Sequence, residues 1–551
     1  MERLRKIVKQ NKAGCVLWIV LIMLGEVLFF HNILFNDNLI GYRVDGRLVT
    51  FLTEHWYQVF LGNEGWEELP CFYPEKNVLA YSDMMLLFGG PFILLRIVGV
   101  DMYTALKITV ILFHVLGSYL LYYFMRKYVQ ASGAVSFLTV VCFSFTNGYN
   151  CNSANMQMFA LSLLPVLLIA GAYYIKNLEQ KKRHIAAIVA VVWLAMLFYT
   201  SFYVAYFVCL FSGIVIIVYA IGYFVLRKHE WVRVAEKKVV RHIREYMLYL
   251  LLFALCMLPF ICLYLPALKD FGGRSWEEIE MLFPGWKNIC MLNEKNDELA
   301  AFNPEIYNYK TGFPIIDLII YGIAGIGICI FIFRKKRKSG LRRKEYMYLL
   351  GGIIIFLAFI LILQIRGFTL WYFIYKFIPG ASAIRAVIRW LCFISLPMAI
   401  FLGAVLTYFS KESGFNKKYT EKLALILSLV MFCSNYCVIG IGTGWSVSGE
   451  INFEKSVKAP PQDCKVMYVV DKDRMIHRGA QEVQLDAWAI ALKFQLKTIN
   501  GYSGQIPKGW DLLDITQNGT DQKVREWLEL YGQTEDGVYY YDLGKNEWGK
   551  L

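Results

Sequence analysis

The sequence predicts a mainly α-helical, polytopic membrane bundle of about eleven spans, which ends in a small α/β domain outside the cytoplasm. Three observations lead to this fold class. Of the 551 residues, 57% are hydrophobic and only 18% are charged, a balance outside the usual range of soluble domains. The apolar residues gather in runs of membrane-spanning length, and the basic residues collect in every second loop between these runs.

A helix that crosses a hydrocarbon core of ~30 Å needs roughly 20 mostly apolar residues, because unpaired backbone groups are costly in lipid. Runs of about this length lie at residues 14–35, 102–125, 131–150, 157–175, 185–200, 202–226, 246–266, 313–333, 345–365, 387–409 and 422–442. A further apolar stretch, 84–98, is shorter and is interrupted by Gly89, Gly90 and Pro91. We therefore expect this stretch to be interfacial or re-entrant.

The orientation follows from Lys and Arg, which stay preferentially on the cytoplasmic side in short loops. Of the 57 basic residues, 30 precede the first span or follow every second span. We therefore expect the N-terminus and the loops 176–184, 227–245 and 334–344 to be cytoplasmic, and 443–551 to lie outside. The net charge of +14 is then a topology signal. We expect the lipid bilayer as a partner and no nucleic acid, because no basic-aromatic binding module is present.

The chain divides into a transmembrane domain, 1–442, and an extracytoplasmic α/β domain, 443–551. Within the first, the large outer loops are 36–101 and 267–312, and the second of these carries aromatic residues suited to the membrane interface. In the tail, 465–470 and 537–542 are predicted strands. The segments Glu482 to Leu496 and Asp521 to Tyr531 are predicted helices.

Acidic residues of the first outer loop are candidates for acid-base chemistry. Asp45 follows the first span by about ten residues and precedes Gly46, a residue that lets the backbone turn sharply. A carboxylate placed there can remove a proton from a hydroxyl group. Glu54 and Asp83 are further candidates in the same loop. The alternative is that Asp45 and Arg47 form a surface salt bridge or cap a helix.

An arginine pair at the outer end of a span is the second candidate feature. Arg385 and Arg389 are four residues apart, so on a helix both would point to the same face, and Arg366 lies across the same short loop. A guanidinium fork matches a phosphate geometrically. The alternative is that these side chains reach the headgroups of ordinary phospholipids.

The tail contributes the segment Asn500 to Gly504, in which Tyr502 can stack on a sugar face. It can equally be a tight turn with a packed tyrosine. The 13 Cys form no CxxC pair and no Cys/His metal spacing, so the sequence indicates no cofactor, although it leaves a divalent metal open.

Four motifs together resemble a known family. They are D-G-R-(x)6-E-H-W and F-Y-P-(x)6-Y-S-D in the first outer loop, I-P-G-A-S-A-I-R-A-V-I-R-W in the middle, and N-G-Y-S-G-Q-I-P-K-G-W in the tail. The chain is similar to bacterial membrane glycosyltransferases of the GT-C type, in particular the teichoic-acid and lipid-decorating members. The resemblance implies a multi-pass enzyme of the bacterial cytoplasmic membrane. It would transfer a hexosyl or pentosyl group from a polyprenyl-phosphate carrier to a cell-envelope polymer or lipid outside.

The resemblance also implies roles for single residues. An acidic residue of the first outer loop is catalytic in this family, and Asp45 matches it, with Glu54 and Asp83 as second choices. Arginines that hold the carrier phosphate map onto Arg385 and Arg389. The remaining expected substrate-binding residues are Arg47, His55, Tyr73, Arg366 and Tyr502. The paired-acid motif of some metal-dependent members is absent, so the resemblance does not imply a metal.

Two other functions compete with this one. A flippase or transporter of a lipid-linked sugar or another amphiphile would explain the spans and the arginines, but it predicts functional groups at mid-bilayer. The spans contain few such groups, which are Glu26, Lys107, His114, Asp317 and Gln364. A structural or signalling membrane protein with a sensing tail is the third alternative.

Overall fold

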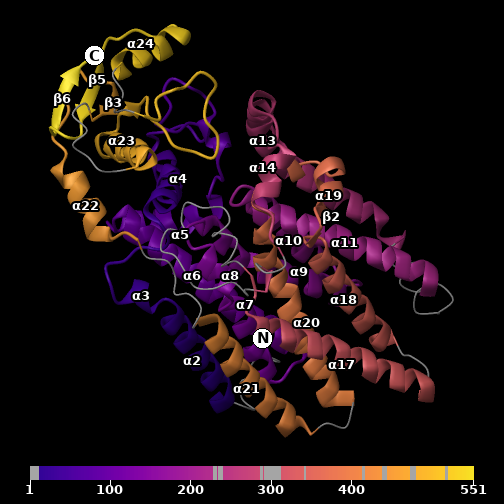
Figure 1. Ribbon diagram of the computed structural model, residues 1–551. Helices are drawn as coiled ribbons and strands as arrows, with labels where there is room; N and C mark the ends of the chain where they lie inside the picture. The colour runs from indigo at the N-terminus through magenta and orange to yellow at the C-terminus, as the bar shows by residue number, and fades with distance from the viewer. Residues whose placement is uncertain are drawn as a thin grey trace.

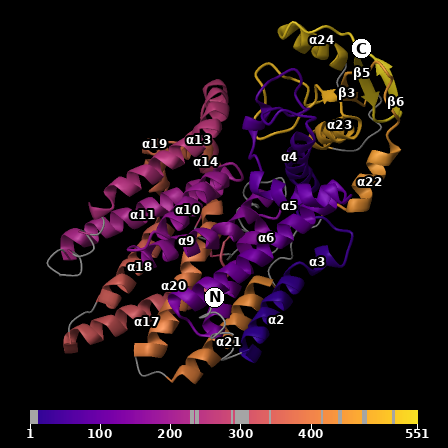
Figure 2. The same cartoon turned by 180° about the vertical axis from the view of Figure 1, so that it is seen from behind.

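The computed structural model describes most of the chain (Figure 1). The described residues are 12–226, 233, 237, 240–285, 289–290, 312–339, 343–412, 416–436, 444–471, 479–514 and 519–551. Trp286, one of the aromatic residues of the second outer loop that are suited to the membrane interface, lies outside them. Long helices dominate the described part. The tail strands β3 (Val466–Val470), β5 (Val538–Asp542) and β6 (Glu547–Lys550) lie at one end of the molecule together with α4 (Arg43–Leu61) (Figures 1 and 2).

The structure has a helix at each predicted span, with boundaries that mostly differ by a few residues. These helices are α2 (Lys12–Phe29), α6 (Met102–Phe124), α7 (Gly133–Ser144), α9 (Leu164–Lys176), α10 (Arg183–Phe198), α11 (Phe202–Leu226), α13 (Ile243–Phe271), α17 (Ile315–Ser339), α18 (Arg343–Ile360), α20 (Trp390–Glu412) and α21 (Lys417–Tyr436). Among the described residues, six helical stretches are long and apolar enough to cross a membrane. The chain is a multi-pass membrane protein, and the count of eleven spans stays a prediction.

Two predicted spans differ in form from an uninterrupted α-helix. The run 131–150 contains α7, which ends at Ser144, and then the short α8 (Asn147–Cys151). The run 157–175 begins as the 3-10 helix η3 (Met156–Leu163) before α9 continues it. A polar stretch from Asn147 to Asn155 covers the end of the first run and the link to the second, and its side chains compete with helical hydrogen bonding.

The apolar stretch 84–98 forms α5 (Leu86–Ile97), a helix of 12 residues with Pro91 inside it. At a rise of 1.5 Å per residue, a helix of this length covers ~18 Å, well short of a hydrocarbon core. The expectation that 84–98 is not a full span agrees with this length.

The core of the bundle is built around α7, which is buried at almost every position from Ala134 to Ser144. The helices α2, α6, α20 and α21 pack against it. A helix that is hydrophobic on all sides is suited to such a central position.

The polar residues expected inside the spans all have partners. Glu26 and His114 lie 2.7 Å apart, between Oε2 and Nδ1. Asp317 accepts hydrogen bonds from Ser434 and Asn435. The remaining contacts join Lys107 Nζ to the carbonyl groups of Asn36 and Asn38, and Gln364 Nε2 to Glu280 Oε1. Pairing of this kind removes much of the cost of polar groups in a membrane.

The tail holds a four-stranded sheet in the order β4-β3-β5-β6. Its strands are β3 (Val466–Val470), β4 (Lys497–Thr498), β5 (Val538–Asp542) and β6 (Glu547–Lys550). The central strand β3 is parallel to β4 and β5, with Tyr468 opposite Tyr540, whereas β5 and β6 are antiparallel. All five residues of β3 are buried, as expected for a strand covered on both faces.

Helices connect and cover these strands. The helix α23 (Ala480–Phe494) lies between β3 and β4 in the chain and packs on β3. The helix α24 (Thr520–Leu530) precedes β5. Both helices and both predicted strands therefore lie where the sequence predicts them.

Candidate active site

Asp45 lies in the first turn of α4, where a negative charge is favoured by the helix dipole. The sharp turn expected at Gly46 is not present, because Gly46 lies inside this helix. Gly46 instead permits a close approach, since a Cβ added there would lie 2.4 Å from the Trp445 ring. The carboxylate of Asp45 is partly exposed and makes no hydrogen bond within the described part of the chain.

The two arginines do not share an α-helix, and the expectation of a shared helix face is therefore wrong. Ala381–Ala383 and Val387–Arg389 form two short 3-10 turns, η5 and η6, and Arg385 lies in the extended link between them. The α-helix α20 begins only at Trp390. We name residues 381–389 the arginine segment.

Contacts with Tyr203 fix the arginine segment on α11. The hydroxyl oxygen of Tyr203 accepts hydrogen bonds from the backbone N–H groups of Arg385 and Ala386, at 2.9 and 3.1 Å. Its ring lies 4.8 Å from the guanidinium carbon of Arg389, and Nη2 of Arg389 donates to Asn155 Oδ1 at 2.6 Å. A single tyrosine thus positions the backbone at one arginine and the guanidinium of the other.

The electrostatic environment links Asp45 to both arginines. Burial raises the pKa of Asp45 above the ordinary value of an aspartate, and the positive charges of Arg389 and Arg385 act in the opposite direction. A carboxylate with a raised pKa is a stronger base than an exposed aspartate.

Asp83 approaches the same arginine from the other end of the first outer loop. Its Oδ1 accepts a hydrogen bond from the backbone N–H of Phe202 at 2.8 Å, at the start of α11. The pKa of Asp83 is raised to about 6 because burial disfavours its charged form. The Phe202 N–H, the charge of Arg389 and a hydrogen bond with Gln157 all act to lower it.

Tyr502 reaches this region from the tail. The pKa of its hydroxyl is raised to about 12, mainly by burial and also by the nearby Asp45 carboxylate, while Arg385 acts in the opposite direction. No hydrogen bond to this hydroxyl is present among the described residues. Asp45, Arg385 and Tyr502 come from three distant parts of the chain, and all three are partly or fully exposed.

Backbone pairing between the tail and the first outer loop positions Tyr502. Phe72 N–H donates to the Asn500 carbonyl at 2.9 Å, and Tyr73 N–H donates to the Thr498 carbonyl at 2.9 Å. A Cβ on Gly501 would lie 2.6 Å from the Phe72 ring, so only glycine fits next to Tyr502 at this distance. The tail thus holds Tyr502 on a short ribbon fixed to the loop.

Two other predicted site residues, Glu54 and His55, have partners within the protein. Glu54 pairs with Arg96 through distances of 2.8 and 3.1 Å and accepts from Gln58. His55 is buried between Glu64 and the Trp66 carbonyl.

Arg47 is fully buried between α4 and the tail. Its Nη1 donates to Asp486 Oδ1 at 2.7 Å, and its Nε lies 3.1 Å from Glu450 Oε2. Burial alone would lower the pKa of Arg47, but the two acids raise it above its usual value. This contact joins the tail to the first outer loop.

Tyr73 also connects this loop to the tail, through its hydroxyl on Gln533 and its carbonyl on Trp527. Arg366 is exposed in the turn between the two short strands β1 (Gln364–Ile365) and β2 (Phe368–Thr369). The structure therefore brings Asp45, Asp83, Arg385, Arg389 and Tyr502 into one region, and gives Glu54, His55, Arg47, Tyr73 and Arg366 other surroundings.

Three residues of the site are not predicted by the sequence analysis. Asn155 and Gln157 contact Arg389 and Asp83, and Tyr203 contacts the arginine segment. The polar stretch 147–155 is the signal for Asn155, whereas Gln157 lies at the start of the next apolar run, outside that stretch. Tyr203 lies in an apolar run among other aromatic residues and gave no signal.

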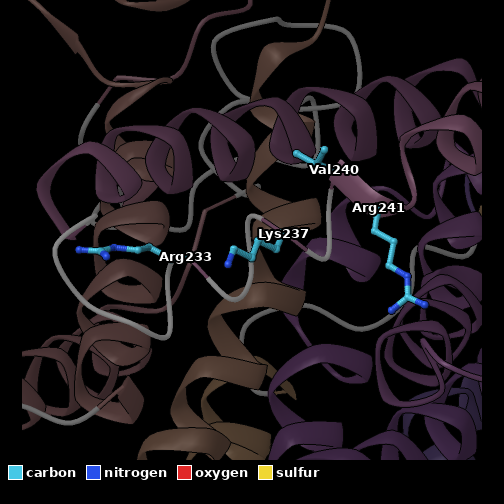
Figure 3. Close-up of a pocket in the computed structure, with 4 residues that line it drawn as sticks. All are labelled: Arg233, Lys237, Val240 and Arg241. Carbon is cyan, nitrogen blue, oxygen red and sulfur yellow. The ribbon is translucent and has the colours of Figure 1, made fainter.

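Two hollows in the described part of the surface lie elsewhere and are lined by none of these residues. An open depression of about 470 Å³ is lined by Arg233, Lys237, Val240 and Arg241, whose side chains point in different directions (Figure 3). A small cavity of about 50 Å³ separates the end of α4 from α23. In the described part of the chain, no group of three or more His, Cys, Asp or Glu side chains is arranged to hold a metal ion.

Comparisons with known proteins give distant structural likenesses only. No family model matches the chain, and no curated protein matches it. The similar solved structures include the arabinofuranosyltransferase AftD from mycobacteria, with 12% identity and a TM-score of 0.48 over 82% of this chain. The Archaeoglobus fulgidus oligosaccharyltransferase has 11% identity and a TM-score of 0.47 over 88% of this chain. ArnT from Cupriavidus metallidurans has 11% identity and a TM-score of 0.46 over 96% of this chain and 93% of its own.

The chain spans only 29% of the length of the AftD chain and 62% of the oligosaccharyltransferase chain. Two of these neighbours are named as glycosyl-transferring enzymes, an arabinofuranosyltransferase and an oligosaccharyltransferase. With TM-scores below 0.5 they do not decide what this chain does.

Proposed function

We propose that the chain is a membrane glycosyltransferase that moves a sugar from a polyprenyl-phosphate carrier to a hydroxyl group of an extracytoplasmic acceptor. The observation that supports this most directly is the meeting of Asp45, Arg385 and Tyr502. Asp45 supplies a base, Arg385 a cation and Tyr502 an aromatic hydrogen-bond donor. All three residues are partly or fully exposed, and among the described residues no hydrogen bond involves the side chain of Asp45 or Tyr502.

The groups match the demands of the reaction. The acceptor oxygen forms a bond to the anomeric carbon while the bond from that carbon to the phosphate oxygen breaks. The acceptor proton passes to the Asp45 carboxylate, and the electron pair of the broken bond stays on the lipid phosphate. Arg385 and Arg389 stabilise the charge that grows on this phosphate, because a guanidinium binds phosphate oxygens in a fixed fork.

Asp45 is a better candidate for the base than Asp83 or Glu54. Asp83 is engaged by Phe202 N–H and Gln157, and Glu54 by Arg96. Asp83 is well placed to position Arg389, whereas a base needs a lone pair that is open to the substrate. Tyr502 can stack on the sugar or donate to it.

A transporter is less well supported, because the polar residues of the spans are paired with one another or with backbone groups. No observation on the described part of the chain favours a mid-bilayer path.

The test is transfer by purified protein from a panel of polyprenyl-phosphate hexoses and pentoses, followed by release of polyprenyl phosphate. The Asp45→Asn variant should lose about 100-fold or more in kcat, because it keeps the shape of the side chain and loses the proton acceptor. Donor binding should stay intact or tighten, since a negative charge near the arginines is removed.

The matched control is Asp511→Asn, an exposed aspartate of the tail paired with Lys523, which should retain wild-type transfer. Wild-type transfer rates in Asp45→Asn would show that Asp45 is not the base. Inactivity of the wild-type protein with every donor of the panel would contradict the proposed transfer.

A further inference from the structure

A third arginine, Arg274, lies between the arginine segment and the Tyr502 loop. Its backbone N–H donates to the Ser382 carbonyl at 2.9 Å, and its Nη2 donates to the Gly504 carbonyl at 2.6 Å. The Tyr375 hydroxyl donates to its carbonyl at 3.1 Å. Arg274 is thereby fixed to both segments that carry the candidate phosphate-binding and sugar-binding side chains.

Glu278 bridges two of the three arginines. It lies on α14 (Trp276–Met281), one turn after Arg274. Its Oε1 is 3.0 Å from Nη1 of Arg274 and 3.7 Å from Nη1 of Arg385. One carboxylate oxygen thus lies between two guanidinium groups, which is a position that a phosphate oxygen can also occupy.

The bridge is weak on the side of Arg385. The distance of 3.7 Å is too long for a hydrogen bond, and the side chain of Arg385 is 50% exposed. Glu278 is itself 30% exposed, so water screens the pair. A ligand with a higher negative charge can therefore displace this contact without unfolding anything.

We propose that Arg274 is the third cation of the phosphate-binding site, and that Glu278 holds the place of a phosphate oxygen until the ligand displaces it. The inference deepens the proposed function and rests on its carrier phosphate. The ligand chemistry is a phosphate monoester or diester, whose oxygens bind Arg385 and Arg274 in place of the Glu278 carboxylate.

The experiment measures the affinity of the full-length protein for two probes, polyprenyl phosphate in micelles and inorganic phosphate in solution. Glu278→Gln should bind polyprenyl phosphate about 3- to 10-fold more tightly, because the competing charge is gone. The matched control is Glu277→Gln, which changes an exposed acid on the same short helix and should leave affinity unchanged.

Arg274→Gln should weaken binding about 10-fold, since it removes a charged hydrogen-bond donor. In the double variant Arg274→Gln with Glu278→Gln, the gain from the second change should disappear, because both act on one oxygen position. Arg274→Lys retains the charge and serves if Arg274→Gln does not fold. It should lie between wild type and Arg274→Gln.

A gain with both probes identifies the phosphate group alone as the ligand, and a gain with polyprenyl phosphate only identifies the lipid-linked form. Unchanged or weaker binding by Glu278→Gln would overturn the proposal, as would an equal gain in Glu277→Gln. Binding is measured without turnover, so an absence of transfer combined with a gain in Glu278→Gln would reject the transferase and keep the phosphate site.

Discussion

At the scale of single residues, Asp45 and Asp83 approach the same guanidinium and differ in what surrounds their oxygens. Arg389 lowers the pKa of both carboxyl groups, and burial raises both. Asp83 also accepts the N–H of Phe202, whereas no hydrogen bond to Asp45 is present in the described residues. The two carboxyl groups can thus have different roles, because Asp83 positions the guanidinium of Arg389 and Asp45 is open to the substrate.

This arrangement predicts a shift of the pH profile in Arg389→Gln. The base must be ionised, so kcat/KM falls as the pH drops through its pKa. Removal of Arg389 takes away a charge that lowers this pKa, and the acid limb should move to higher pH. The profile is measured by transfer rates between pH 4 and 8.

Two controls sharpen this measurement. Arg366→Gln changes an exposed arginine of the β1–β2 turn and should leave the acid limb where it is. The shift should persist in an Asp83→Asn background if Asp45 is the titrating group. An acid limb that stays in place or moves to lower pH in Arg389→Gln would show that another group titrates.

The sequence identifies the kinds of residue in the site better than their contacts. The sequence predicts Asp45 and Asp83 as acids of the first outer loop, Arg385 and Arg389 as a pair at a span end, and Tyr502 as an aromatic residue of the tail, and the structure brings them together. Arg47 is predicted in the same loop as Asp45, but its partners Glu450 and Asp486 lie about 400 residues away in the chain. No local pattern distinguishes a buried structural arginine from one that meets a ligand.

At the scale of elements, the helices were predictable because each needs its own apolar length. The break after Ser144 and the 3-10 start of the next run were not, because they depend on where polar side chains find partners. The prediction of a helix through the arginine segment was wrong for a similar reason. A four-residue spacing suggests a helix, but contacts with Tyr203 hold this backbone in two separate turns.

The ribbon between the tail and the first outer loop is the element that sets the position of Tyr502. Gly501→Ala should push the tail strand away from Phe72, because the new Cβ would lie 2.6 Å from the ring. We expect a loss of about 1 to 3 kcal/mol in stability and a drop of about tenfold in kcat/KM. Thermal unfolding in detergent and transfer rates measure the two effects.

Gly479→Ala is the matched control within the tail, since an added Cβ there meets no atom within 4 Å. In Gly501→Ala with Phe72→Leu, the smaller side chain leaves room and should restore part of both losses. Wild-type rates in Gly501→Ala would separate Tyr502 from catalysis, or show that the ribbon can shift without moving it.

At the scale of the whole molecule, the site joins parts of the chain that the membrane spans keep apart in sequence. Asp45 belongs to the first outer loop, Arg385 to the segment before α20, and Tyr502 to the tail. Ion pairs of Arg43 and Arg47 with Glu450, Glu482 and Asp486 fasten the tail to α4. Figures 1 and 2 show α4 and the tail sheet at the same end of the molecule.

The contacts between the tail and the first outer loop predict which parts of the chain share a compartment, whichever way the protein is oriented in the membrane. A reporter inserted into the exposed turn at 62–65 after α4 must lie in the same compartment as a reporter fused at Leu551. A reporter inserted into the turn at 179–182 between α9 and α10 must lie in the opposite one, because α9 ends there after crossing the bundle.

The basic loops add the direction, since they favour the cytoplasmic side. We therefore expect alkaline phosphatase to be active at 62–65 and at Leu551, and a cytoplasmic fluorescent reporter to be bright only at 179–182. The reverse pattern at all three sites would invert the membrane orientation and leave the site intact, with nucleotide sugars then available to it. Opposite signals at 62–65 and Leu551 would be incompatible with the hydrogen bonds of Phe72 and Tyr73 to the tail, and a site that combines Asp45 with Tyr502 could not exist.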